Sequence, residues 1–392
     1  MRARRFASSI VVVWAAFGSW LGCNAILGNE AAVFDPIDSL GAEAGPGPDV
    51  VTSSDSSFPD SAIPNDGNTC VDVDKNPAHC GRCGHDCLGG ACVSGRCQPI
   101  LVASDNEGPS AIAIDHSHVY WTNSETGELH RAPIAGDAGS EVLYANDAGF
   151  GTRFDVHGEN VYFVRIGDSS ILQCPKSGCG STAPTPIATA AQVPSALLVN
   201  DAGALFWTEL DPDGGIGTCD LPCTGTVTYR VSHETRPTFL AVDGPALFWT
   251  TLGPSQVRGQ SAPGDEARTL TSKQFLSDVK VAGERVFYTN LGEAARVVFR
   301  DGGGDMALPK AGTNIGPLAT DGADVYFAEQ SDQGRIFRCP VTGCAAAPEV
   351  IATSQGRPTA LAVDAVSIYW TNSGATQTDG GTAGPGVMRL AK

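Results

Sequence analysis

The chain has 392 residues, of which 47 are glycine and 25 are proline, and only 7% are aromatic. This composition favours many turns and short strands over long helices. With 43 acidic and 25 basic residues the net charge is -18, which argues against nucleic acid and anionic membrane surfaces as partners, because both need clustered cations to bind them.

The first 22 residues have the layout of an export signal. Three arginines precede the apolar run 10–19, which reads IVVVWAAFGS and is too short for a membrane span. The following Gly22 and Cys23 resemble a bacterial lipobox, in which the cysteine is acylated and becomes the new N-terminus. We therefore predict a lipoprotein signal peptide over 1–22 and lipidation of Cys23, with ordinary signal cleavage as the alternative.

Residues 23–69 are predicted to be a lipidated, disordered acidic tether. The segment has eight acidic residues after position 29 and no lysine or arginine, and such a chain cannot bury enough apolar surface to fold. Asn24, rather than aspartate, follows the cysteine. In the lipoproteins that this motif resembles, that choice implies an outer-membrane address, facing either the periplasm or the exterior.

A cysteine-rich module is predicted over residues 70–97. So short a segment has almost no core and needs covalent crosslinks, and an exported chain supplies them as disulfides whose pairing the sequence leaves open. The pattern NPAHCGRCGHDC resembles the repeat of Stig1-like modules of exported proteins. A zinc site of Cys80, Cys83, His85 and Cys87 is the alternative, since C-x2-C is a metal-ligand spacing. The six cysteines of the module are Cys70, Cys80, Cys83, Cys87, Cys92 and Cys97.

An aromatic pair recurs along the rest of the chain. Successive pairs are 42, 44, 42, 39, 39 and 43 residues apart, and a period near 42 corresponds to one four-stranded blade of a β-propeller. The pairs are Tyr120-Trp121, Tyr162-Phe163, Phe206-Trp207, Phe248-Trp249, Phe287-Tyr288, Tyr326-Phe327 and Tyr369-Trp370.

Each unit begins with an alternating segment of small residues, such as AIAID or TALAVD, which is typical of the innermost strand of a blade. An aspartate often lies five residues before the first aromatic, in the turn between the first two strands. Such a residue can bond its own backbone and stabilise the turn, and a ring of carboxylates facing the channel is the alternative. These aspartates are Asp115, Asp201, Asp243, Asp321 and Asp364.

The two ends of the repeat region complement each other. The last unit stops at GVMRLAK and has no fourth strand, whereas PILVAS at 99–104 precedes the first unit and matches the fourth strand EVIATS. The sequence thus predicts an all-β fold over 98–392, a seven-bladed β-propeller of seven ~42-residue repeats in which an N-terminal strand completes the last blade.

The first repeat, AIAIDHSHVYWTNSETGELHRAPIAG, resembles the YWTD-type β-propellers of lipoprotein-receptor ectodomains. Asn123 and Asn372 stand where that motif has its final aspartate, and the family's propellers have six blades where this chain has seven units. The resemblance implies a protein-binding scaffold rather than an enzyme.

The six remaining cysteines form three close pairs, each at the turn between the third and fourth strands of its unit, and we expect three short disulfides. The pairs are Cys174 with Cys179, Cys219 with Cys223, and Cys339 with Cys344. The loop LDPDGG contains Asp211 and Asp213, which are weak calcium candidates because the later carboxylate ligands of a calcium loop are missing.

No nucleophile elbow, zinc-protease motif or phosphate-binding loop occurs in the sequence. We therefore expect no catalytic residues, no bound metal and no cofactor. The predicted function is that of a monomeric, membrane-anchored envelope or cell-surface protein that binds a protein, peptide or glycan through the loops of its propeller. A propeller enzyme of the metal-dependent hydrolase or lactonase type and a structural envelope component are the alternatives.

Overall fold

The computed structural model describes residues 70 and 72–392, except 106, 137–138, 146–149, 180–181, 225–226, 310–311, 313, 345 and 375–382. All of them belong to one compact unit, Asn65–Lys392. The predicted signal peptide, the lipidation of Cys23 and the predicted tether lie outside the described residues. No helix in the described part of the chain is long and apolar enough to cross a membrane.

Seven four-stranded antiparallel sheets make up the bulk of the fold. Blade 1 contains β4 (Pro109–Ile114), β5 (His118–Asn123), β6 (Glu128–Pro133) and β7 (Glu141–Ala145). Blade 2 contains β8 (Phe150–His157), β9 (Asn160–Arg165), β10 (Ser170–Pro175) and β11 (Thr185–Thr189), with the 3-10 turn η2 (Ile166–Asp168) after β9. Blade 3 contains β12 (Pro194–Val199), β13 (Ala204–Glu209), β14 (Gly214–Asp220) and β15 (Thr228–Glu234).

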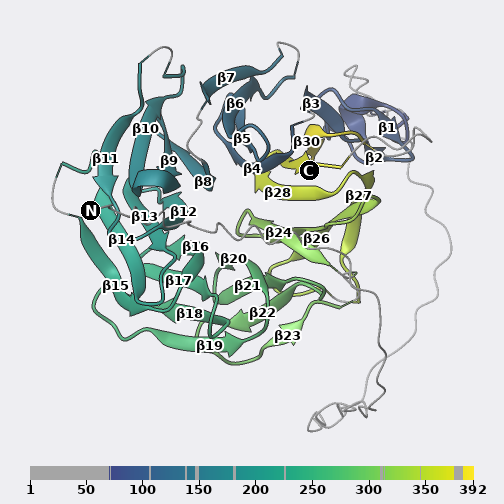
Figure 1. Cartoon of the computed structure of the whole chain (residues 1–392). Coiled ribbons are helices and arrows are strands. Elements are labelled where there is room, and N and C mark those ends of the chain that lie inside the picture. Colours follow the sequence, from purple (N-terminus) through teal and green to yellow (C-terminus); the bar gives the residue numbers. More distant parts are fainter. Residues whose placement is uncertain are drawn as a thin grey trace, which may run out of the picture. The chain divides into compact units, whose positions relative to one another are not determined.

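Blade 4 contains β16 (Pro237–Asp243), β17 (Ala246–Thr251), β18 (Gln256–Gln260) and β19 (Arg268–Ser272). Blade 5 contains β20 (Leu276–Ala282), β21 (Arg285–Asn290), β22 (Arg296–Phe299) and β23 (Met306–Ala307). Blade 6 contains β24 (Ile315–Thr320), β25 (Asp324–Glu329), β26 (Gly334–Pro340) and β27 (Glu349–Gln355). Blade 7 contains β28 (Pro358–Val363), β29 (Ser367–Asn372), β30 (Gly386–Ala391) and β3 (Ile100–Ser104). The first strands of the blades lie around the centre and the fourth strands at the rim (Figure 1).

The last blade is completed by a strand from the start of the domain. β3 pairs antiparallel with β30, and Ile100 lies opposite Arg389 while Ser104 lies opposite Gly386. The strand therefore joins residues almost 290 positions apart and removes an exposed sheet edge. The prediction of a seven-bladed propeller closed by an N-terminal strand is confirmed.

The two aromatic residues of each pair pack against different neighbours. Adjacent residues of a strand point to opposite faces of the sheet, so that Tyr120 packs with Phe163 of blade 2, whereas Trp121 packs with Val387 of blade 7. The same arrangement recurs at the other interfaces, where Tyr162 packs with Trp207 and Tyr326 with Trp370. All fourteen rings are buried, and each contributes about 2–3 kcal/mol through the water it excludes.

Threonine hydroxyls form a second set of contacts between blades. A fully buried threonine follows the aromatic pair in five blades, and its hydroxyl bonds the first strand of its own or the next blade. Thr208 donates to the carbonyl oxygen of Thr238 at 3.0 Å, and Thr289 donates to that of Gly316 at 2.7 Å. These bonds satisfy buried polar groups while fixing adjacent blades in register. The five residues are Thr122, Thr208, Thr250, Thr289 and Thr371.

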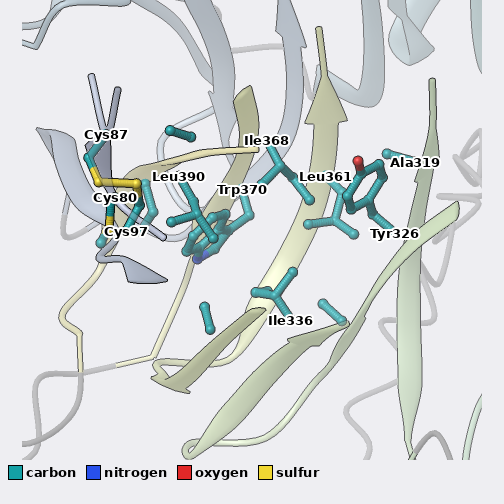
Figure 2. Close-up of a cluster of buried hydrophobic side chains, with 14 of the residues drawn as sticks. Cys80, Cys87, Cys97, Ala319, Tyr326, Ile336, Leu361, Ile368, Trp370 and Leu390 are labelled. Carbon is teal, nitrogen blue, oxygen red and sulfur yellow. A yellow bond between two sulfur atoms is a disulfide. The ribbon is translucent and has the colours of Figure 1, made fainter. Parts of the chain in front are cut away.

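The cysteine-rich module packs against the last blades. It contains the 3-10 turn η1 (Pro77–His79) and the short hairpin of β1 (Cys92–Val93) and β2 (Arg96–Cys97). Three disulfides crosslink it, Cys70–Cys83, Cys80–Cys92 and Cys87–Cys97. Figure 2 shows two of them beside Leu390 and Trp370 of blade 7, with which four of the cysteines share one buried cluster. The module thus extends the apolar core of the propeller rather than folding around its own.

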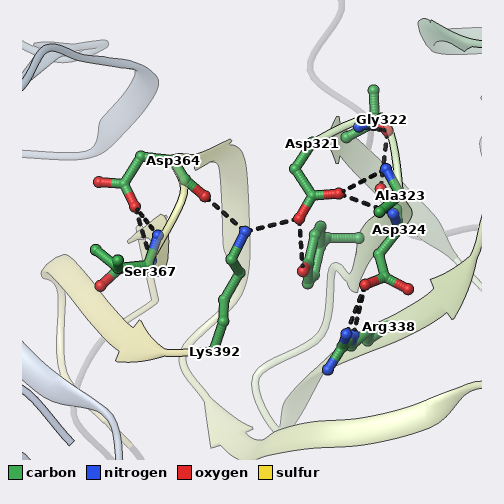
Figure 3. Close-up of polar contacts among 11 residues, drawn as sticks. Asp321, Gly322, Ala323, Asp324, Arg338, Asp364, Ser367 and Lys392 are labelled. Atoms are coloured by element: carbon green, nitrogen blue, oxygen red, sulfur yellow. Dashed lines mark hydrogen bonds and ion pairs between the residues drawn. The ribbon is translucent and has the colours of Figure 1, made fainter. Parts of the chain in front are cut away.

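Three of the predicted turn aspartates accept hydrogen bonds from backbone amides of their own turns. The carboxylate of Asp321 accepts bonds from the amides of Ala323 and Asp324 at 3.0 and 2.8 Å, and from Lys392 at 2.7 Å (Figure 3). Burial raises the pKa of Asp321, but these bonds outweigh it and lower the pKa to about 2. Asp115 and Asp364 bond their own turns in the same way, so the turn interpretation holds for three of the five aspartates. Asp243 instead pairs with Arg300. In the turn after β12 it is Asn200, not Asp201, whose side chain accepts from the amide of Ala204.

The closure of the ring can be tested on two neighbouring residues of β3. Val102 is 3% exposed and packs on Trp121, whereas Leu101 is 51% exposed. We expect Val102→Asp to lower the free energy of unfolding by at least about 3 kcal/mol, because an unpaired charge would be buried. Leu101→Asp should cost no more than about 1 kcal/mol. Urea unfolding followed by tryptophan fluorescence measures both, and equal costs for the two variants would contradict this packing.

Candidate binding channel

A cavity runs along the axis of the ring. Its volume is 540 Å³, and residues of all seven inner strands, β4, β8, β12, β16, β20, β24 and β28, line it. Small side chains such as Ala111 and Ala360 leave the space, because the blades come closest to one another at the axis. Leu291 and Gln330, which lie just beyond the second strands of blades 5 and 6, also line the cavity. The channel therefore reaches the end of the ring where the inner strands begin.

Two cations project into this channel from different blades. The guanidinium of Arg153 on β8 lies 4.4 Å from the ring centre of Phe239 on β16, which is a cation-π contact. Burial lowers the pKa of Arg153, and the charge of Asp278 opposes that effect. Lys280 on β20, two residues after Asp278, donates to the Asp278 carboxylate at 3.0 Å. Both cations are partly reached by solvent through the channel.

The carboxylates of the channel are bonded to the backbone of the next blade. Asp155 on β8 accepts from the amide of Val199 on β12 at 2.8 Å, and Asp278 on β20 accepts from the amide of Leu318 on β24 at 2.9 Å. Each also accepts from the amide that follows it in its own strand. The two aspartates therefore do the same structural work at two interfaces, and their oxygens are less available to a ligand than the two cations.

The sequence did not single out the residues of the channel. Arg153, Asp155, Phe239, Asp278 and Lys280 stand at positions that differ from repeat to repeat. The one available signal was a charged residue within a segment that other repeats fill with small or apolar side chains, as in RFDVH beside AIAID. The five turn aspartates, which were the predicted alternative for a ring of carboxylates, do not line the channel.

Cysteines and calcium candidates lie away from the channel. The prediction of disulfide bonds is confirmed, and the short pairs are Cys174–Cys179, Cys219–Cys223 and Cys339–Cys344. The alternative zinc site is not formed, because its three cysteines are in disulfides and the two ring nitrogens of His85 face the carbonyl oxygens of Cys80 and Lys392.

The two calcium candidates make contacts within the protein. Asp213 pairs with the exposed His233 at 2.9 Å, and Asp211 accepts from the amide of Asp213.

No family model matches the chain, and no curated protein matches it. Among solved structures, a virginiamycin B lyase from Staphylococcus aureus has a TM-score of 0.57 at 13% identity and covers 75% of this chain and 98% of its own. The WD40 β-propeller domain of Doa1 has a TM-score of 0.56 at 12% identity, covering 75% and 97%. A nidogen/laminin complex overlaps less closely, with a TM-score of 0.43 at 18% identity over 50% of this chain and 78% of the other.

At such identities these matches show the propeller fold alone. Proteins with the same fold serve unrelated functions, so function has to be argued from the site. The resemblance of the repeat to YWTD-type propellers stays a prediction beyond the shared architecture.

The environment of Asp155 can be tested by its effect on stability. Burial raises the pKa of Asp155 to about 6, against the opposing effect of the bonds from Val199 and Val156. This value exceeds the unfolded pKa of about 4, so the folded state holds one more proton between these pH values. Stability should therefore fall as the pH rises from about 4 to about 6, by up to about 3 kcal/mol.

Other groups titrate in the same window, so the informative quantity is a difference. Urea unfolding gives the free energy of unfolding of the wild type and of Asp155→Asn at each pH. The wild-type value minus the variant value should fall as the pH rises from about 4 to about 6. If the two proteins instead keep a constant difference from pH 4 to pH 7, Asp155 is not perturbed by burial in the channel.

Proposed function

We propose that the chain is a lipid-anchored, non-catalytic binding protein of the cell envelope that takes an acidic group of a protein, peptide or glycan ligand into the mouth of its axial channel. The observation that carries this proposal is the pair of cations, Arg153 and Lys280, in the channel of a protein whose net charge is -18. A strongly acidic protein that directs cations into a concave site is suited to select an anion there.

The chemistry of the channel favours a carboxylate over a neutral group. A guanidinium bonds a carboxylate through two parallel N–H groups, and such charge-assisted bonds gain strength where water is scarce. Phe239 holds the guanidinium of Arg153 in place, which reduces the entropy lost on binding. Ser110, Ser277 and Thr359 also line the cavity, but their hydroxyls already bond to groups of the fold, so the two cations are the main recognition groups.

The composition of the lining supports binding rather than catalysis. Among the described residues that line the channel there is no histidine, cysteine or glutamate. Asp155 and Asp278 are already bonded to backbone amides, so neither is free to act as a nucleophile or to hold a metal ion without breaking a contact between blades. Anchoring through Cys23 would then place the channel at the membrane, where the acidic tether sets its reach.

One observation favours a second candidate, a propeller enzyme. The raised pKa of Asp155, about 6, is in the range that suits a general acid or base at neutral pH. This role would require the carboxyl group to leave the amides of Val199 and Val156, which is why we rank it second.

A panel of ligands tests the binding proposal. Peptides with glutamate or glutamine and glycans with uronic acid or neutral sugars should be presented to the purified full-length chain. We expect acidic members to bind, and Arg153→Gln and Lys280→Gln each to weaken that binding at least tenfold. Arg268→Gln, which removes an exposed arginine of β19, should bind as the wild type does.

Equal binding by the channel variants and the wild type would contradict a ligand site in the channel. If the wild type converts any acidic ligand to a product and Asp155→Asn does not, the chain is an enzyme and the binding proposal is wrong. If no acidic member binds while neutral members do, the proposed ligand class is wrong.

The anchor is tested separately by fractionation. The wild type, expressed in a bacterium with a lipoprotein pathway, should sediment with the outer membrane and carry an acylated N-terminal cysteine by mass spectrometry. Cys23→Ala should move it to the soluble fraction, because the acyl chains supply the membrane affinity. Unchanged sedimentation of Cys23→Ala would contradict the lipid anchor.

A further inference from the structure

We propose that blade 1 contains a binding site for one divalent transition-metal ion, formed by Glu107, Asn123, Glu128 and His130. Glu107 belongs to the connection between β3 and β4, Asn123 ends β5, and the other two lie on β6. None of the four residues lines the axial channel, and the site is independent of the function proposed above.

The four side chains bring their polar atoms to one point. One ligand atom each of Glu107, Glu128 and His130 lie within 4.8 Å of one another. Nε2 of His130 is 3.1 Å from an oxygen of Glu128 and 3.0 Å from the carboxamide of Asn123, which is 3.3 Å from an oxygen of Glu107. Donor atoms that are about 2.1 Å from a common ion are about 3.0–3.5 Å apart. The pair of His130 and Glu128 already has this spacing, and Glu107 would have to move closer to complete the site.

The hydrogen bonds within this group cannot all be made at once. Nε2 of His130 must carry a proton to donate to the carboxylate of Glu128, and must lack one to accept from the amide nitrogen of Asn123. A cation at the centre resolves the conflict, because imidazole and both carboxylates would then direct lone pairs at it. The geometry is that of a ligand set rather than of a closed hydrogen-bond network.

Asn123 provides an independent indication. Its side chain is 2% exposed, its amide nitrogen points at Glu107 and His130, and its oxygen Oδ1 has no hydrogen-bond partner. A half-turn of the carboxamide would exchange the two ends and point Oδ1 into the group. That rotation gives up the contacts of the amide nitrogen with Glu107 and His130 and adds Oδ1 as a fourth ligand. Leaving such a buried oxygen unsatisfied otherwise costs about 1–3 kcal/mol.

The site is rigid. His130 is 7% exposed and its ring stacks on that of Trp121, with centroids 5.4 Å apart and planes at 17°. The indole nitrogen of Trp121 donates to Asp105, in the same connection as Glu107. Ser124 bonds the carbonyl oxygen of Gly108 through its amide and its hydroxyl, both at 2.9 Å, which holds Glu107 against blade 1. Fixing His130 in this way reduces the entropy that its side chain loses on binding.

The donor set indicates the class of ion. One imidazole nitrogen excludes a site built for calcium or magnesium, which take oxygen ligands, while two carboxylates and an amide oxygen suit Zn²⁺ or Mn²⁺. Because Glu107 comes from the segment that leaves the closing strand β3, the ion would clip that segment to blade 1. Metal binding would thereby strengthen the closure of the ring.

Equilibrium dialysis of the purified, chelator-treated full-length chain against ZnCl2 or MnCl2, followed by elemental analysis, tests the proposal. We expect one tightly held ion per chain and a higher melting temperature in its presence. Glu107→Gln and His130→Gln should each weaken binding at least tenfold. Glu107 is exposed, so its variant should fold as the wild type does, which circular dichroism checks.

The control is Glu125→Gln, which removes the same charge from an exposed residue of the adjacent turn and should leave binding unchanged. If Glu125→Gln and Glu107→Gln weaken metal binding equally, the ion is only attracted to an acidic surface and the proposal is overturned. The absence of a bound ion in the wild type would also overturn it. Co²⁺ locates the site, because it should quench the fluorescence of Trp121; undiminished quenching in Trp121→Phe would place the ion elsewhere.

Discussion

The fold depends on closing a circle of sheets, none of which is stable alone. Both faces of every blade carry large apolar side chains, so each blade needs a neighbour on either side. Six interfaces follow from chain order, and the seventh must be made between the first blade and the last. The pairing of β3 with β30 brings this about, because the chain crosses from blade 7 into blade 1 directly after β3. Thr359 reinforces the junction by donating to the carbonyl oxygen of Pro109 at 2.7 Å.

The architecture could be predicted because it repeats. A Tyr120-Trp121 pair that recurs every ~42 residues fixes the second strand of each blade, and alternation then gives both interfaces at once: one ring faces the next blade and the other faces the preceding blade. The missing fourth strand at the C-terminal end and the surplus strand at 99–104 are also visible in the sequence. A threonine follows the aromatic pair in five of the seven repeats. The bonds that Thr208 and Thr289 make to the next blade depend on how the blades are spaced, which no single repeat reveals.

The sites could not be predicted for the opposite reason, since they are departures from the repeat. Arg153 and Phe239 come from blades 2 and 4 and meet only because both inner strands face the axis. Glu107 and His130 belong to a connection and a strand whose counterparts in other blades hold different residues. Disulfide pairing in the module was likewise undetermined by spacing alone. In the structure Cys80 pairs with Cys92 and Cys87 with Cys97, and all four lie in one buried cluster with Trp370.

Closure by β3 is the claim on which everything else rests, and amide hydrogen exchange read by mass spectrometry tests it most directly. We predict that the hydrogen-bonded amides of Ile100–Ser104 exchange as slowly as those of β27, the fourth strand of the preceding blade, and that both open together in global unfolding. Exchange of Ile100–Ser104 within seconds, while β27 and β30 stay protected, would contradict it.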